Sequence, residues 1–462
     1  LNFGKMLDKI KNIYFLGIGG IGMSAIARYF NAKGYSVAGY DKTETELADK
    51  LRSEGIQVHF EDNTVFIPED FKNPNYTLVV YTPAIPDDLT EYLFFKKNNF
   101  TIMKRSQILG AITKSQEAIC IAGTHGKTTT TTMIAHTLHN SFLDCNAFLG
   151  GLSKNFESNL HLSNKSNLVV VEADEFDRSF LTLAPQIAVV TATDADHLDI
   201  YGTYEEYLKS FEQFVALIKP GGALIMKYGL PIKPDVQEGV KIYTYSVDKG
   251  DFHAENIKIA NGKITFDVVY PLGILKGVDL GVPVYINIEN AIATCAVSLM
   301  KGLSHEEIRK AIASFQGVSR RFDFHIKQDN LVLVDDYAHH PNEVKASIES
   351  LRRLYSDKKL TGVFQPHLYT RTRDFADEFA ASLSLLDEVL LLDIYPAREE
   401  PIEGVTSQII LDKVTAKEKR LVSKDELLDY VRTHSIEVLA TIGAGDINLM
   451  LPQIKNILLS KV

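Results

Sequence analysis

The segment with the clearest chemistry is residues 123–128, which read Gly-Thr-His-Gly-Lys-Thr. An apolar run at 118–122 comes directly before it and predicts a strand. Backbone N–H groups of a glycine turn at a helix N-terminus can bind phosphate oxygens, a lysine adds a positive charge, and the next hydroxyl can ligate Mg²⁺. The segment therefore predicts a site for a nucleoside triphosphate, formed by Gly123, Thr124, His125, Gly126, Lys127, Thr128 and Thr129.

This loop is shorter than the common G-x-x-x-x-G-K-[ST] pattern, because Ile121 stands where that pattern has its first glycine. A purely structural loop would need neither Lys127 nor the hydroxyl run that follows it. The shorter loop therefore indicates a narrower group of phosphate-binding proteins, and it does not argue against phosphate binding.

A second glycine-rich turn follows the predicted strand 13–16 and contains Gly17, Gly19, Gly20 and Gly22. The next predicted strand, 36–40, ends at Asp41, and a third, 77–81, leads into Thr82 and Ala84. This spacing is typical of dinucleotide-type folds, in which glycines let the backbone approach a pyrophosphate and the acid meets a ribose or base. A simple tight turn is the alternative interpretation of the glycines.

Acidic groups follow two later strands. Glu172 and Asp174 come after 168–171, and Asp194, Asp196, His197 and Asp199 come after 187–191. The carboxyl ends of parallel strands meet in one crevice, and Mg²⁺ prefers oxygen ligands. We therefore expect Glu172 to be a metal ligand and His197 to lie in or near a metal shell, although both could also be ordinary strand-end or surface residues.

The last third of the chain carries a further cluster at predicted strand ends. Asp335, Asp336, Tyr337 and His339 follow the strand 331–334, and His367 and Arg371 follow the strand 362–364. Their clustering favours a binding face, whereas His340, beside Pro341, is interpreted as structural.

Composition narrows the class of protein. The chain has 462 residues, a net charge of −10 and three dispersed cysteines, Cys120, Cys145 and Cys295. The negative charge argues against nucleic-acid binding, and unpaired cysteines fit a reducing, cytoplasmic compartment. The sequence shows neither a signal-peptide pattern nor a run of about 20 apolar residues, so we expect no membrane association.

The strand and helix patterns alternate through the whole chain and predict an α/β protein with three domains in series. The expected domains are an N-terminal Rossmann-like domain (1–110), a central phosphate-loop ATPase-like domain (111–317) and a C-terminal Rossmann-like domain (318–462). An alternating segment around Asn261-Gly262 predicts a β-hairpin, and hence an antiparallel extension of the central domain.

Several strings together resemble the Mur ligase family of bacterial peptidoglycan synthesis, and the likeness extends from Gly17 to Asp446. The strings lie at residues 123–128, 171–180, 196–199, 320–322, 335–341, 365–373 and 393–401. Those of the last third are more specific than the glycine loops.

The resemblance implies ATP-dependent ligation of L-alanine to the lactyl carboxylate of UDP-N-acetylmuramate through an acyl phosphate, in a monomer or weak homodimer. It places the UDP-sugar on the first domain, at the glycines 17, 19, 20 and 22 with Asp41, Thr82 and Ala84. It places ATP on the second domain and implies that the third closes over both.

The resemblance also implies individual roles. Lys127 would hold the γ-phosphate, Thr128 and Glu172 one Mg²⁺, and His197 a second. Asn290 would contact adenine, and Arg321 and Asp336 the nucleotide. Tyr337, His339, His367 and Arg371 would meet the alanine or muramate end, so the implied catalytic residues are Lys127, His197, His339 and Arg371.

Two positions depart from the family pattern. Ile286 stands where many relatives have histidine before the adenine motif, and Leu368 stands where relatives often have arginine. One adenine contact and one substrate contact are therefore in question.

Alternative functions stay open at this stage. A sister ligase would attach a whole peptide to the same sugar nucleotide, or glutamate to another precursor. A nicotinamide-dependent oxidoreductase would leave the phosphate loop unexplained, and a non-catalytic scaffold would leave the strand-end acids, histidines and arginines unexplained.

Overall fold

The computed structural model describes residues 6–195, 198–260, 263–397 and 399–461, and its chain divides into two compact units. The first unit is built from the residues up to Glu255 with Asp267–Val278 and Glu289–Phe315. The second contains Asn256–Phe266, Asp279–Ile288 and Gln316–Val462. The predicted domain boundaries at 110/111 and 317/318 stay a prediction.

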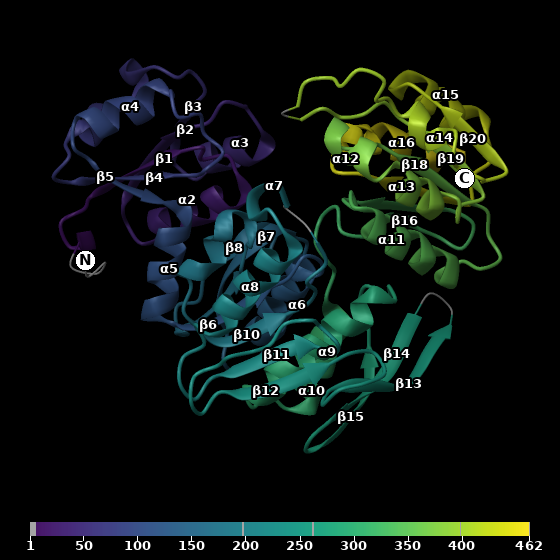
Figure 1. The fold of residues 1–462 in the computed structure, drawn as a ribbon, viewed down its shortest axis with the longest axis horizontal. Helices are drawn as coiled ribbons and strands as arrows, with labels where there is room; N and C mark the ends of the chain where they lie inside the picture. Colours follow the sequence, from purple (N-terminus) through teal and green to yellow (C-terminus); the bar gives the residue numbers. More distant parts are fainter. Residues whose placement is uncertain (1–5, 196–197, 261–262, 398, 462) are drawn as a thin grey trace. The chain divides into compact units, whose positions relative to one another are not determined.

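The N-terminal part of the first unit is a parallel sheet with the strand order β3-β2-β1-β4-β5 (Figure 1). Every residue of β1 is buried, as expected for a central parallel strand. The strands are β1 (Asn12–Leu16), β2 (Ser36–Tyr40), β3 (Gln57–His59), β4 (Thr77–Tyr81) and β5 (Thr101–Lys104), and the helices are α2 (Ile21–Ala32), α3 (Glu46–Ser53), α4 (Thr90–Lys97) and α5 (Arg105–Ser115).

The central sheet has the order β12-β11-β10-β6-β9-β7-β8. β6 pairs in parallel with β9 and with β10, so the carboxyl ends of these three strands lie side by side. The strands are β6 (Glu117–Ala122), β7 (Asn146–Ser153), β8 (Ser158–His161), β9 (Leu168–Glu172), β10 (Pro185–Val190), β11 (Ala223–Lys227) and β12 (Lys241–Tyr245).

Helices surround this sheet, and one of them begins directly at the phosphate loop. That helix is α6 (Lys127–His139), and the others are α7 (Leu198–Tyr201), α8 (Tyr204–Val215), α9 (Ile286–Met300) and α10 (His305–Ser314). A three-stranded sheet follows, with the order β13-β14-β15, formed by β13 (His253–Ala260), β14 (Lys263–Tyr270) and β15 (Gly273–Asp279). β13 and β14 are neighbours, as the hairpin prediction requires, while the Asn261-Gly262 turn lies outside the described residues.

The second unit carries a sheet with the order β16-β17-β21-β18-β19-β20, in which only the β16–β17 pairing is antiparallel among the described strands. Its strands are β16 (Asp323–Lys327), β17 (Val332–Asp336), β18 (Leu360–Phe364), β19 (Glu388–Leu391), β20 (Glu418–Leu421) and β21 (Val438–Ile442). Its helices are α11 (Pro341–Leu354), α12 (Tyr369–Asp374), α13 (Ala376–Leu383), α14 (Gln408–Leu411), α15 (Lys424–Thr433) and α16 (Leu451–Leu459).

A short helix follows the strand that ends at Phe364. α12 starts at Tyr369, and its N-cap residue Leu368 has a φ of 71°. Arg371 therefore lies on a helix and not in a strand-end loop. The interpretation of His340 as structural agrees with its position, because it is the N-cap of α11 and its Nδ1 accepts a hydrogen bond from the Asn342 backbone N–H at 3.4 Å.

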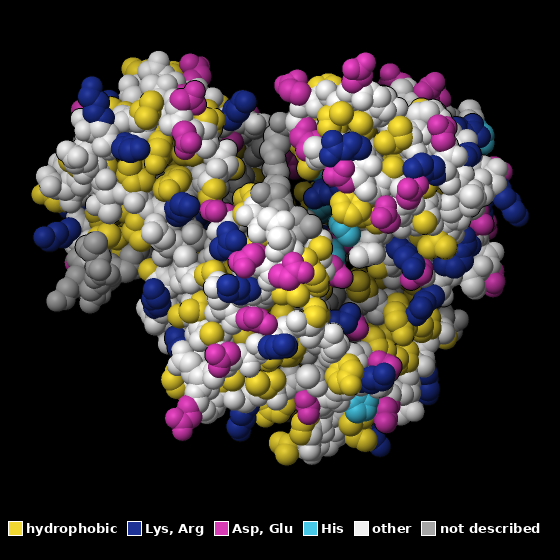
Figure 2. Space-filling model, viewed as in Figure 1, with side chains coloured by type: hydrophobic (Ala, Val, Ile, Leu, Met, Phe, Trp, Pro, Cys, Tyr) yellow, Lys and Arg dark blue, Asp and Glu magenta, His cyan; other side chains and the backbone are white. Residues whose placement is uncertain are grey.

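The helices of the described residues are too short or too polar to cross a membrane. On the face drawn in Figure 2, basic and acidic side chains are interspersed within each unit. Such mixing agrees with recognition of anions by individual loops, and the absence of nucleic-acid binding stays a prediction.

A buried carboxylate lies in the core of the N-terminal sheet. Glu91, on α4, is 0% exposed, and the Tyr14 hydroxyl donates to its Oε2 at 2.7 Å. The same hydroxyl oxygen also lies 2.7 Å from His59 Nε2. Burial raises the pKa of Glu91 to about 7 from its ordinary 4.5.

We predict that Glu91 makes stability fall with rising pH. The folded state holds the proton more tightly than the unfolded chain, so stability is lost between pH 4.5 and about 7. Glu91→Gln keeps the shape and an acceptor but cannot ionise. The variant should gain up to about 3 kcal/mol over the wild type at pH 8 and little at pH 4, measured by urea unfolding.

The exposed acid Glu69, 87% exposed at its side chain, provides the control. Glu69→Gln should change the free energy of unfolding by the same small amount at pH 4 and at pH 8. A constant difference between wild type and Glu91→Gln across this range would contradict the prediction.

Candidate functional site

The phosphate loop joins β6 to α6 and is shaped by two glycines with positive φ. Gly123 has a φ of 137°, and Gly126, the N-cap of α6, has a φ of 79°. Neither conformation suits an L side chain. The Thr191 hydroxyl from the end of β10 donates to the His125 carbonyl, and the Asp194 backbone N–H donates to Thr124 Oγ1 at 2.9 Å. These two hydrogen bonds therefore hold the loop against the residues that follow β10.

Lys127 is the first residue of α6, and its ammonium group points back over the loop. Its Nζ donates to the Gly123 carbonyl at 2.5 Å and to Glu175 Oε1 at 2.8 Å. Burial alone would lower the pKa of Lys127, but the carboxylates of Glu175 and Glu172 raise it overall. Lys127 is therefore charged and oriented where a phosphate would lie.

Glu175 is 1% exposed, and burial raises its pKa although Lys127 opposes that shift. No separate role was predicted for Glu175, although it lies in the same acidic string as Glu172. Its position beside the lysine makes it the group that holds Lys127 in place.

Glu172, the last residue of β9, lies across the strand ends from the loop. Its carboxylate packs on Gly150 of β7, where a Cβ would collide with it. Thr128, on the first turn of α6, is 6% exposed. These oxygen-bearing groups fit a Mg²⁺ ion, because carboxylate and hydroxyl oxygens are ligands that Mg²⁺ accepts. His197, the other predicted metal residue, lies outside the described residues.

A cavity of about 100 Å³ lies between Glu172 and the N-terminal glycine turn. Its lining includes Gly22, Gly150, Glu172 and Asp174, and also Arg105 from the start of α5. Arg105 Nη2 donates to Asp174 Oδ2 at 2.9 Å. Sequence analysis missed Arg105, because no local pattern distinguishes it from other arginines at a helix start.

In the glycine turn before α2, Gly17 has a φ of 86° and Gly20 is the N-cap of the helix. The Gly19 backbone N–H donates to Asp41 Oδ2 at 2.7 Å. Asp41 therefore shapes the turn itself, a role not predicted for it. Thr82 follows β4 beside Gly17, and the Ile85 backbone N–H donates to the Thr82 carbonyl, forming the turn that contains Ala84.

Asn290 of α9 lies against the phosphate loop. The Thr130 hydroxyl donates to Asn290 Oδ1 at 3.0 Å, and the same oxygen lies beside Gly126. The structure therefore brings Asn290 to the nucleotide loop, from 160 positions away in sequence.

The second unit gathers its candidate residues at the carboxyl ends of β17, β18 and β21. Arg320 donates to the Gly443 carbonyl at 2.7 Å and to the buried Asp335 at 3.4 Å. The Arg320 and Arg321 guanidinium groups lie 4.9 Å and 5.1 Å from the Tyr337 ring centre. Burial raises the pKa of Asp336 to about 6.

His339 and His367 lie next to one another, with ring centres 6.1 Å apart, and His367 stacks on Tyr395. His339 Nδ1 lies 2.9 Å from the Tyr337 carbonyl, so this nitrogen carries the hydrogen. Burial lowers the pKa of His339, and the charge of Arg371 lowers it further. The predicted C-terminal residues thus form one cationic and aromatic face within this unit.

Three family profiles match the chain in series. They are the Mur ligase family catalytic domain at residues 12–117, the Mur ligase middle domain at 121–298, and the Mur ligase glutamate ligase domain at 320–452. The predicted class, three α/β domains in series, is confirmed.

Relatives and solved structures resemble the whole chain. The UDP-N-acetylmuramate–L-alanine ligase of Phocaeicola vulgatus is 58% identical and that of Parabacteroides distasonis 56%, covering 98% and 99% of this chain and 100% and 99% of their own. The crystal structure of the UDP-N-acetylmuramate–alanine ligase from Thermotoga maritima matches with a TM-score of 0.80 at 27% identity, over 97% of this chain and 98% of that one.

A murein peptide ligase from Psychrobacter arcticus shares the fold, with a TM-score of 0.67 at 21% identity, over 96% of this chain and 99% of that one. The profiles cover most of the chain, and the relatives match it from end to end. The chain therefore belongs to the Mur ligase family.

Proposed function

We propose that this protein joins L-alanine to the lactyl carboxylate of UDP-N-acetylmuramate, using ATP, in the synthesis of peptidoglycan precursors. The observation that carries the proposal is the phosphate loop at the end of β6, with Lys127 fixed over it by Glu175. The choice of substrates rests on the relatives with 58% and 56% identity, which are named for this reaction.

The chemistry explains the residue types. A carboxylate does not accept an amine, because oxide is a poor leaving group. The γ-phosphoryl group therefore passes to a carboxylate oxygen as its bond to ADP breaks. The alanine nitrogen then attacks the acyl carbon, the carbon–oxygen bond to phosphate breaks, and the amine loses a proton. Negative charge develops in both steps, so fixed cations lower both barriers.

We assign the triphosphate to the backbone N–H groups of the 123–129 loop and to Lys127. A phosphate would replace Glu175 as the main partner of Lys127. Thr128 and Glu172 would hold Mg²⁺, which when bound neutralises charge between the phosphate and the carboxylate. The assignment of His197 to a second ion continues to rest on the sequence resemblance alone.

We assign the UDP-sugar to the turn before α2, where the N–H groups of Gly20 and Gly22 begin a helix, with Thr82 and Ala84 beside it. Asp41 would act there chiefly by shaping the turn, since it accepts from the Gly19 N–H. Arg105 lines the cavity between this turn and Glu172. There it would orient the muramate end.

We assign adenine to Asn290, and the nucleotide contacts of the second unit to Arg321 and Asp336. Tyr337, His339, His367 and Arg371 would meet alanine and the reacting carboxylate. The lowered pKa of His339 keeps it neutral at pH 7, which suits acceptance of the amine proton. The protein would act as a cytoplasmic monomer or weak homodimer.

Phosphate release is the test of this function. With UDP-N-acetylmuramate, ATP and Mg²⁺, single L-alanine should support turnover, while the tripeptide used by a peptide-adding ligase and L-glutamate should not. Turnover with the peptide and not with alanine would favour the sister activity, whose fold this chain shares.

We predict that Lys127→Ala lowers the rate of ligation by about three orders of magnitude or more, because it removes a cation from the transferring phosphoryl group. The affinity for the UDP-sugar, measured by calorimetry, should stay unchanged. Since the single variant also leaves the buried Glu175 without its ammonium partner, Lys127→Ala with Glu175→Gln provides the control. That pair should regain thermal stability and stay inactive, whereas turnover near that of the wild type in either variant would remove Lys127 from the chemistry.

Glu172→Gln should raise the Mg²⁺ concentration needed for half-maximal rate by roughly tenfold, because an amide oxygen is a weaker ligand than a carboxylate. The amide fits the same space against Gly150. A Mg²⁺ dependence identical to that of the wild type would place the ion elsewhere.

Arg371→Lys keeps the charge but loses the planar fork that matches a carboxylate. We expect the apparent KM for L-alanine to rise by roughly one to two orders of magnitude, or about 1.4 to 2.8 kcal/mol, with ATP affinity little changed. Arg432→Lys, at an exposed helical arginine paired with Asp429, is the matched control in the same unit. A collapse of ATP affinity with an unchanged alanine KM would instead assign Arg371 to the nucleotide.

A further inference from the structure

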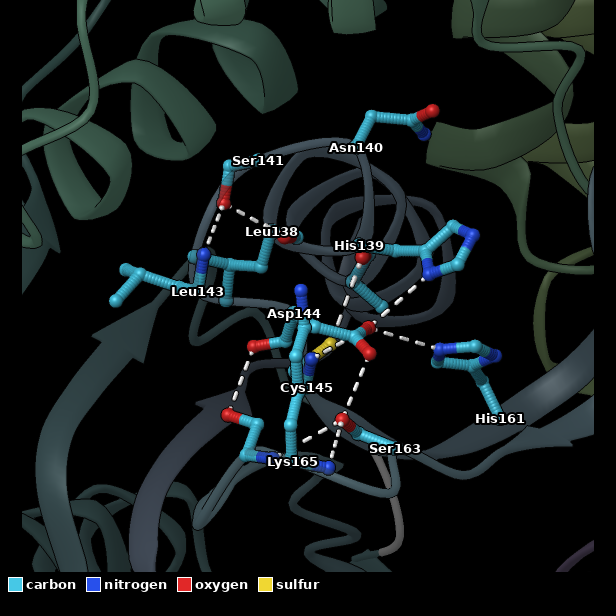
Figure 3. A network of polar contacts seen from close by, with 12 residues as sticks. Leu138, His139, Asn140, Ser141, Leu143, Asp144, Cys145, His161, Ser163 and Lys165 are labelled. Carbon is cyan, nitrogen blue, oxygen red and sulfur yellow. Dashed lines mark hydrogen bonds and ion pairs between the residues drawn. The ribbon is translucent and has the colours of Figure 1, made fainter.

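Two histidines and one aspartate converge at the end of α6 opposite the phosphate loop (Figure 3). His139 is the last residue of α6, Asp144 lies in the turn before β7, and His161 is the last residue of β8. His139 Nδ1 lies 3.0 Å from Asp144 Oδ1, and His161 Nε2 lies 3.1 Å from the same oxygen. Both histidines therefore direct a ring nitrogen at the same carboxylate oxygen, and one ligand atom from each of the three side chains lies in a small cluster.

The three ligand atoms have the spacing of a coordination shell. All lie within 4.8 Å of one another. In a tetrahedral zinc site with bonds of about 2.0 Å, neighbouring ligand atoms are about 3.3 Å apart. The two imidazole-to-carboxylate distances are already close to that edge, and the distance between the two imidazole nitrogens is at most 4.8 Å, so the side chains would have to move apart or together only locally to admit an ion.

The protonation of the cluster also suits a metal. An ionised carboxylate can only accept, so in the metal-free protein each histidine presents an N–H to Asp144. The rings are 4.3 Å apart between centres. An imidazole can carry its hydrogen on either ring nitrogen, so a hydrogen on the outer nitrogen leaves the inner lone pair for a cation.

The surroundings fix these side chains in place. Ser163 Oγ donates to Asp144 Oδ2 at 2.7 Å, and the Cys145 backbone N–H donates to Oδ1, the oxygen that faces the histidines, at 2.9 Å. The Phe156 ring stacks on His161 with centres 4.6 Å apart and meets His139 edge-on at 5.5 Å. Supporting contacts of this kind orient first ligands in metal sites. The side chain of His139 is 41% exposed, so water can reach a fourth position.

The geometry points to a binding site for a divalent transition-metal ion of the Zn²⁺ class, formed by His139 Nδ1, His161 Nε2 and Asp144 Oδ1, with water as the fourth ligand. Imidazole and carboxylate together suit such ions better than Mg²⁺. The ion would join the end of α6 to β7 and β8, about 18 Å along the helix from Lys127. Its role is structural and is separate from the Mg²⁺ proposed for the ATP loop.

The test uses the full chain after treatment with a chelator and removal of that chelator, in excess Mg²⁺ to occupy oxygen-rich sites. Calorimetry should then show one Zn²⁺ per chain, and Co²⁺ should give the visible absorption of a tetrahedral site. Zn²⁺ at a hundredfold excess over its Kd should raise the thermal midpoint by roughly 5 °C.

Two variants separate metal binding from folding. Asp144 has a φ of 54°, which asparagine tolerates, so Asp144→Asn keeps the turn and an acceptor for both histidines. Asp144→Asn and His161→Gln should each weaken Zn²⁺ binding by roughly a hundredfold and abolish the Co²⁺ spectrum.

His305→Gln is the control, since His305 lies on α10 and contacts Tyr270. It should bind Zn²⁺ like the wild type. Equal Zn²⁺ affinity in the wild type and both variants would overturn the proposal. It would also be overturned if Zn²⁺ did not change the thermal midpoint of the wild type while Asp144→Asn lowered that midpoint in the absence of metal. The second result would show that the cluster is only a hydrogen-bonded turn.

Discussion

The parallel pairing of β6 with β9 and β10 is the constraint on which the candidate phosphate-binding region depends. Ile121 pairs with Glu172, and Ala122 pairs with Val190, so the loop after β6, the acid that ends β9 and the threonine after β10 meet at one edge. A shift of one residue in either pairing would turn alternate side chains to the other face. Backbone hydrogen bonds between these strands thus place the phosphate loop, the Glu172 carboxylate and the Thr191 hydroxyl. No functional side chain takes part in those bonds.

Charged groups beside the candidate sites lie in pairs. Lys127 faces Glu175, Arg105 faces Asp174, and Arg320 faces Asp335. Removing Lys127 leaves the buried Glu175 without its charge partner, which is strongly destabilising. The Lys127–Glu175 pair has a further consequence, because a phosphate and Glu175 would compete for one ammonium group. The acid keeps the lysine oriented before nucleotide arrives, at some cost in affinity.

The second unit arranges its groups differently. Gly443 and Gly445 follow β21 without a lysine like Lys127, and cations of this unit lie against aromatic rings. Arg320 and Arg321 lie on Tyr337, while His339 and His367 adjoin it. Aromatic faces hold guanidinium groups without neutralising them, so Arg321 stays available to an anionic ligand. A carboxylate or phosphate would be recognised here by side chains and not by a helix N-terminus.

The sequence by itself determined the features that depend on neighbouring residues. The glycine turns, the strand before each turn, and the acids at the ends of β9 and β17 are local patterns, and the structure places them at strand ends as predicted. The family strings are local patterns too. His197 stays a prediction from sequence alone. Only the tertiary structure decided which distant residues meet. These contacts depend on strand order and register, which no local pattern specifies. They are the contacts of Glu175 with Lys127, of Arg105 with Asp174, of Asp41 with the Gly19 N–H and of Asn290 with Gly126, and the cluster of His139, Asp144 and His161. The same holds for Arg371, which lies on a helix that begins at Tyr369, directly after Leu368, whose φ of 71° is not predicted by its residue type.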